Sequence, residues 1–103
     1  MDPKALLHDF NGAYGLDLRE VPTIKQLEEV LAERVAILID KDFSALVRLL
    51  YRVDVDETKL RQLLRENMTM DAGLLIARLI LERQWQKILT RRQYSRGGGQ
   101  NPV

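Results

Sequence analysis

An apolar run, Leu74–Leu81, constrains the fold of this chain more than any other feature. Only Arg78 interrupts the run, and its other seven residues are apolar. Because an α-helix turns by about 100° per residue, these side chains point to all sides of a helix rather than along one stripe. The run has eight residues, whereas a helix that crosses a bilayer needs about 20. It therefore predicts a central helix with more apolar surface than one compact chain can readily cover, and it favours an interface with a second copy.

The length and composition limit how such a core can be stabilised. The 103 residues suffice for one domain, and they include one histidine and no cysteine. The chain therefore lacks disulfides and the usual ligand set of a structural zinc ion. Oligomerisation is a common alternative for a small core. The residues from Met1 onward show no basic region followed by an apolar stretch, so we expect no signal peptide and a cytoplasmic location.

The helical spacing of apolar residues predicts an all-α fold, a compact irregular bundle of four main helices plus a short N-terminal helix. Residues 1–22 are expected to form an N-terminal arm that contains the short helix, and residues 23–94 the helical domain. The glycine-rich residues 95–103 are expected to form a flexible, disordered tail. The four main helices are expected near residues 23–39, 43–52, 55–66 and 70–94.

Polar residues mark the expected helix ends. Thr23 and Gln26 have the spacing of a capping box, and so do Asp54 and Glu57. The pattern Asp-x-Asp occurs twice, but a calcium loop also needs Gly at its sixth position and Glu at its twelfth, and neither copy has them. We therefore interpret these carboxylates as helix caps: Asp40, Asp42, Asp54 and Asp56.

In two segments, the secondary structure or the side chains that face the core have to be inferred from the apolar pattern. Residues 35–39 are all apolar and fit either a short buried strand or a helix. We favour the helix, because the apolar stripe begins well before this segment and continues through it. In the helix near residues 43–52, we expect five side chains to face the core: Phe43, Leu46, Val47, Leu50 and Tyr51.

Arg78 lies within the apolar stripe of the last helix, one turn before Glu82. Its alkyl stem can follow apolar surface while its guanidinium reaches water. Alternatively, the two residues form a buried pair that fixes the helix register or a two-fold contact. The candidate interface with another chain consists of seven residues of this helix: Leu75, Ile76, Arg78, Leu79, Ile80, Glu82 and Trp85.

The charges are unevenly distributed along the chain, although the formal net charge is +1. Residues 1–71 carry ten basic and fourteen acidic side chains, whereas residues 72–103 carry six basic and one acidic. Basic residues near a helix C-terminus complement the helix dipole, and they also attract anions. The candidate anion-binding residues are Arg83, Lys87, Arg91, Arg92 and Arg96.

No pattern in the sequence indicates catalysis, a metal site or a cofactor. His8 has no second ligand at a metal-binding spacing, and no glycine-rich loop opens a helix to hold a phosphate. We therefore expect a non-catalytic protein–protein interaction module, an adaptor or regulatory subunit, that is homodimeric through its last helix and also binds another protein. The alternative is a small nucleic-acid-binding protein that uses the basic end of that helix. We expect no membrane association.

Overall fold

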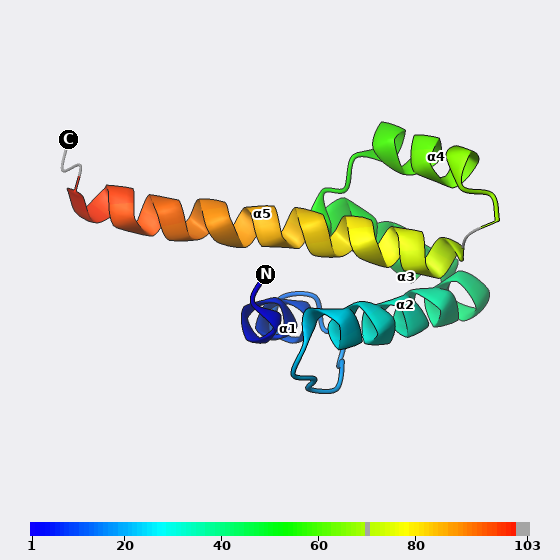
Figure 1. Cartoon of the computed structure of the whole chain (residues 1–103), viewed down its shortest axis with the longest axis horizontal. Helices are drawn as coiled ribbons and strands as arrows, with labels where there is room; N and C mark the ends of the chain where they lie inside the picture. Colours follow the sequence, from blue (N-terminus) through cyan, green and yellow to red (C-terminus); the bar gives the residue numbers. More distant parts are fainter. Residues whose placement is uncertain (70, 101–103) are drawn as a thin grey trace.

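A long helix, α5 (Ala72–Gln100), runs the length of the molecule, and four shorter helices pack beside it (Figure 1). The computed structural model describes residues 1–69 and 71–100, with side chains for residues 1–69 and 71–94. The described residues form five helices and no strand, so the expected all-α fold is confirmed, and residues 35–39 are helical. The shorter helices are α1 (Pro3–Gly12), α2 (Ile24–Lys41), α3 (Phe43–Val53) and α4 (Glu57–Glu66).

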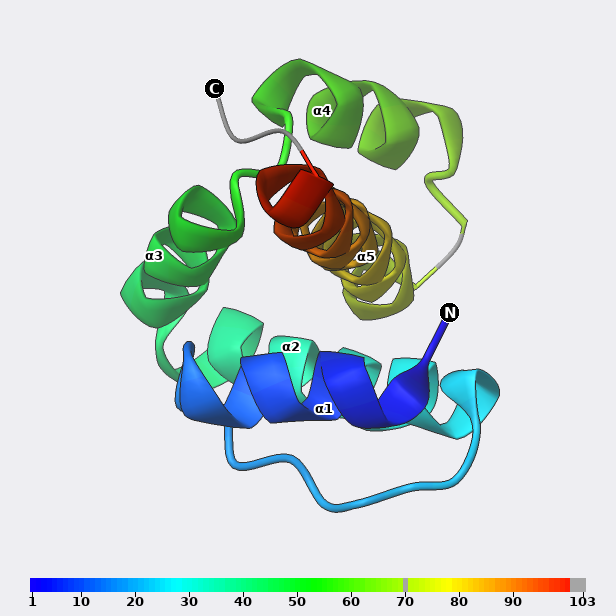
Figure 2. The same cartoon turned by 90° about the vertical axis from the view of Figure 1, so that its left-hand side faces the viewer.

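The core forms where α2 packs along the first half of α5 (Figure 1). Helix α1 lies on the same side of α5 as α2, and α3 closes a neighbouring side (Figure 2). Gly73 allows α2 and α5 to approach closely at the start of α5. A Cβ atom on Gly73 would lie 3.1 Å from the carbonyl oxygen of Ala32 on α2. In contrast, α4 packs against α5 and against no other helix of the described chain.

The N-terminal arm packs on its own chain. Leu6 and Phe10 of α1 are fully buried in the core. After α1 the backbone is extended, and the Asn11 amide holds it by donating to the carbonyl of Leu18 (2.9 Å) and accepting from the Leu18 N–H (2.7 Å). This clamp directs Leu16 and Leu18 into the core, so the arm is a structural part of the bundle.

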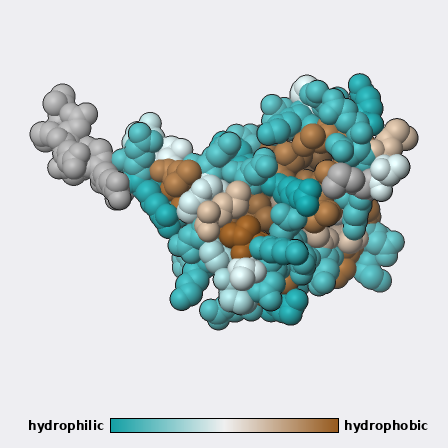
Figure 3. Space-filling view, in the orientation of Figure 1, coloured by the Kyte–Doolittle hydropathy of each residue, from teal (hydrophilic) through white to brown (hydrophobic). Residues whose placement is uncertain are grey.

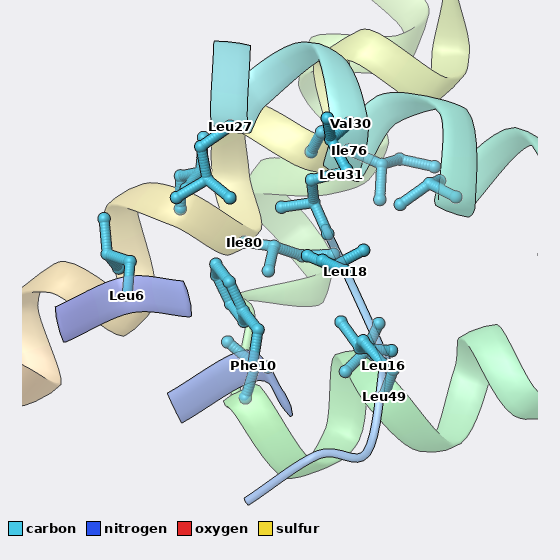
Figure 4. Packing of buried hydrophobic residues seen from close by; sticks show 14 of the residues in the cluster. Leu6, Phe10, Leu16, Leu18, Leu27, Val30, Leu31, Leu49, Ile76 and Ile80 are labelled. Carbon is cyan, nitrogen blue, oxygen red and sulfur yellow. The ribbon is translucent and has the colours of Figure 1, made fainter. Parts of the chain in front are cut away.

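The apolar run of α5 is covered by its own chain, which corrects the expectation that one chain could not cover it. Ile76 and Ile80 lie in the core with Phe10 and Leu31 (Figure 4). Four of the seven candidate interface residues are buried within the chain: Leu75, Ile76, Leu79 and Ile80. The prediction failed because α1, α3 and α4 pack against α5 in addition to α2. The apolar run of α5 therefore gives no reason to expect a second copy on this face.

Local sequence signals set most helix ends. The hydroxyl of Thr23 accepts from the Gln26 N–H (3.2 Å), and the Asp42 carboxylate accepts from the Ala45 N–H (3.1 Å). The start of α4 differs from the prediction, because Asp56 rather than Asp54 caps it. Asp54 instead ends α3 with a left-handed backbone (φ 68°), a conformation that Asp tolerates better than most residues.

The last helix also extends further than expected. Its helical backbone continues to Gln100, six residues beyond Tyr94, although each helical glycine costs about 1 kcal/mol relative to alanine. This end projects beyond the other helices (Figure 1), and its expected flexibility stays a prediction. Residues 101–103 of the expected tail lie outside the described residues. No helix in the described part of the chain combines the length and apolar character needed to cross a membrane.

Candidate interaction surfaces

The basic residues of α5 are largely used inside the molecule. Arg83 donates to the carboxylate (3.2 Å) and carbonyl (3.1 Å) of Asp54, which fastens α5 to the turn before α4. Arg91 pairs with Asp9 (3.1 Å) and Arg92 with Asp2 (3.4 Å), so both hold α1 against α5. Lys87 donates to groups of the same chain as well, so four of the five candidate anion-binding residues have partners within it. The side chain of Arg96 lies outside those described.

Arg78 pairs with Glu28 of α2 (3.0 Å), not with Glu82 as the intrahelical interpretation supposed. Glu82 instead lies 3.8 Å from Lys59 of α4. Both pairs are substantially exposed, so each contributes about 0–1 kcal/mol to stability. Of the two alternatives that the sequence left open for Arg78, the buried pair with Glu82 is therefore absent. The sequence pattern suggested a pair between residues one turn apart on α5. In the fold, Glu28 of α2 and Lys59 of α4 lie close enough to pair with Arg78 and Glu82 instead.

A buried polar network between α1 and α5 was not predicted from the sequence. The Asp9 carboxylate accepts from the Gln84 amide (2.9 Å), and the Tyr14 hydroxyl donates to the Gln84 carbonyl oxygen (2.7 Å). Lys87 donates to the Tyr14 hydroxyl (2.9 Å) and to the carbonyl of Arg52 (3.2 Å). Among the described side chains, no buried nitrogen or oxygen lacks a partner. A fully satisfied network of this kind fixes how helices dock.

Asp2, the N-terminal cap of α1, also contacts α5, through Arg92. Hydrogen bonds from the backbone N–H groups of Ala5 and Lys4 lower the pKa of the Asp2 carboxyl, and the nearby Arg92 guanidinium lowers it further. The carboxylate is thus kept ionised at the positive end of the α1 dipole, where a negative charge is favourable.

Trp85, the remaining interface candidate, is half-buried against the core beneath Arg92, whose guanidinium lies 5.3 Å from the indole ring.

The outer face of α3 carries the most distinctive exposed surface. Phe43, Val47 and Tyr51, which we call the apolar row, are 61%, 50% and 86% exposed. They are four residues apart, so they lie side by side along one face of the helix. This corrects the expectation that all three face the core. The buried face is formed instead by Leu46, Leu49 and Val53.

Within α3, the charges beside the apolar row are of one sign. Arg48 and Arg52 are the only charged residues of α3, and each follows a member of the row by one position. They therefore form a basic strip along one side of the row. Neither has a carboxylate within 4.0 Å among the described side chains. The outer face of α3 is thus apolar along its middle and positive along one edge.

A second apolar region lies between α4 and α5, where Figure 3 shows hydrophobic side chains gathered on one face of the molecule. No residue of α4 is fully buried, and Leu60, Leu63 and Leu64 are half-covered by α5. Unlike the apolar row, this region already faces another helix. It is best described as a loosely packed intramolecular contact.

Comparisons of the chain with protein-family models, with curated proteins and with solved structures find no match. The described residues contain no group of three or more His, Cys, Asp or Glu side chains placed to hold a metal ion. Among the surfaces described above, the apolar row is the strongest candidate for a functional site.

Proposed function

We propose that this protein is a non-catalytic protein–protein interaction module whose docking surface is the outer face of α3. The observation that carries the proposal is the exposure of three large apolar side chains in one row, on a helix whose other face is packed in the core. Buried aromatic side chains dominate the energetics of many protein interfaces, and Phe43 and Tyr51 are available for that role.

The chemistry of α3 favours an acidic, amphipathic partner segment. An apolar face on the partner would cover the apolar row, and carboxylates beside it would meet Arg48 and Arg52. A second copy of α3 would instead bring the same two arginines and no carboxylate. Charge complementarity therefore favours a different protein over self-association on this face.

The alternative function, nucleic-acid binding through α5, has less support. Its candidate side chains Arg83, Arg91 and Arg92 pair with carboxylates of their own chain. Phosphates would have to displace these partners before they could bind.

Binding of three designed helical peptides tests the proposal. The peptides share one apolar face and carry acidic, neutral or basic residues beside it, and fluorescence anisotropy measures their affinity for the full chain. We expect the acidic peptide to bind most tightly and the basic one least. Phe43→Ser and Tyr51→Ser should each weaken binding about tenfold, which corresponds to roughly 1.4 kcal/mol.

Met68→Ser is the matched control, because Met68 is similarly exposed (84%) but lies between α4 and α5. It should leave the affinity unchanged. Equal loss in the control, or affinity that does not depend on peptide charge, would contradict the proposed surface. Binding to vesicles of anionic lipid without binding to the acidic peptide would assign the apolar row to a membrane instead.

A further inference from the structure

A cleft beside α3 collects arginines from two helices. It lies between α2, α3 and the loop that joins α1 to α2, and its volume is about 300 Å³. Arg34 of α2 and Arg48 and Arg52 of α3 line it, so we call it the arginine cleft. Its volume is at the lower end of the range for small-molecule sites.

The arginine cleft has no negative charge to balance these three. None of the described residues that line it is Asp or Glu, and none of the three arginines has a carboxylate within 4.0 Å in the described chain. Arg48 and Arg52 are four residues apart on one helix, a spacing at which like charges repel. A bound anion would relieve this repulsion.

A second cleft shows that this imbalance is not general. It lies between α4 and α5, has a volume of about 490 Å³, and is also lined by charged residues. There, however, both basic residues have a carboxylate partner, because Lys59 pairs with Glu82 and Arg83 with Asp54. Unbalanced positive charge is therefore a property of the arginine cleft.

One of the three guanidinium groups is held in place by contacts within the chain. Arg52 donates to the carbonyl of Ala13, and its guanidinium lies 5.2 Å from the centre of the Tyr14 ring. The side chain of Arg34 is half-buried between α2 and the loop. Donors held in this way lose less conformational entropy when they bind a ligand.

We propose that the arginine cleft binds an organic phosphate, a phosphate monoester carried on a small apolar or aromatic body. Guanidinium groups bind phosphate oxygens with paired hydrogen bonds, and a phosphate has enough oxygens for several of them, whereas a carboxylate has two. The apolar body would lie on the other lining side chains: Leu16, Leu38 and Leu49. The group is supplied either by a free small molecule or by a phosphorylated side chain.

This inference does not depend on docking at the apolar row. Arg34 lies on α2, away from the row, whereas Tyr51 belongs to the row and does not line the cleft. Arg34→Gln should therefore weaken phosphate binding and leave the acidic-peptide affinity unchanged, and Tyr51→Ser should do the reverse. Each proposal can fail while the other holds.

Titration of the full chain with phenyl phosphate, followed by amide chemical shifts in NMR spectra, tests the cleft. We expect saturable shifts in the cleft-lining residues, and at least tenfold weaker binding in Arg34→Gln and in Arg48→Gln. Inorganic phosphate should bind more weakly, because it has no apolar body, and phenol should not bind, because it has no charge. Arg19→Gln and Arg65→Gln are matched controls, since these exposed arginines have no carboxylate within 4.0 Å among the described residues and lie outside the cleft.

Shifts that do not saturate at millimolar phenyl phosphate would overturn the proposal, and so would equal weakening in the control variants. A phosphotyrosine peptide distinguishes the two sources. Tighter binding than phenyl phosphate would identify a phosphorylated protein as the ligand, and equal binding would identify a free small molecule. Circular dichroism of each variant establishes that the fold is retained.

Discussion

The arginines of α5 and those of the arginine cleft differ in whether they have a carboxylate partner. Arg78, Arg83, Arg91 and Arg92 each pair with a carboxylate of another segment. The arginines of the cleft pair with none in the described chain. The first group therefore holds helices together, whereas the second leaves its charge available for something outside the chain.

This difference has a consequence for stability. Removing a charge that has a partner loses an interaction and leaves the partner unpaired. Removing a charge that faces only like charges loses nothing and relieves repulsion. Arg83→Gln, which removes a paired charge, and Arg48→Gln, which removes a charge that faces only a like one, should therefore change the free energy of unfolding in opposite directions.

The largest effect is expected at Asp9, whose buried carboxylate has two partners. Asp9→Ala leaves the buried Gln84 amide without its acceptor and Arg91 without its counter-ion. We expect the free energy of unfolding to fall by about 2 kcal/mol, and the melting temperature by roughly 10 °C. Urea denaturation measures the first and calorimetry the second. Asp40→Ala, an exposed carboxylate near the end of α2, should change stability by less than about 0.5 kcal/mol.

A smaller loss is expected for Arg83→Gln. This substitution breaks the ion pair with Asp54 and removes a hydrogen bond to its carbonyl, both near the surface. The expected cost is about 0.5–1 kcal/mol, and it should shrink in 1 M salt because exposed charges are screened. Urea denaturation at low and high salt measures it. A stability equal to that of the unmodified chain at both salt concentrations would contradict the structural role of this pair.

The parts of the fold that could be predicted are those that local sequence decides. Thr23 and Asp42 begin their helices as predicted, because a cap needs only its own side chain and the next few backbone N–H groups. The apolar run of α5 is likewise helical and buried. What covers it is not local, since Phe10 and Leu31 come from other helices.

The orientation of α3 could not be predicted for a related reason. Seven of its eleven residues are apolar side chains larger than alanine, and they point to most sides of the helix. Apolar spacing alone does not decide whether Leu46 and Leu49 or Phe43 and Val47 face inward. The positions of α2 and α5 decide it, and these come from the tertiary fold.

Contacts between distant residues were also missed. Asp9 and Gln84 are 75 residues apart in the chain, and no sequence pattern links them. The sequence contains one weak sign of the arginine cleft. Neither Arg34 nor Arg48 has an acidic residue three or four positions away on its helix, so neither can form a local ion pair.

The smallest effect is expected for Arg48→Gln, and its sign is opposite to that of Arg83→Gln. Arg48 faces Arg52 one turn away and no carboxylate among the described side chains, so neutralising it should raise the free energy of unfolding by about 0.3 kcal/mol. The gain should vanish in 1 M salt, which screens the repulsion. Paired urea denaturation curves of the two variants measure the difference in sign. If Arg48→Gln instead destabilises the chain as Arg83→Gln does, then Arg48 has a partner within the fold, and its charge is not free for a ligand.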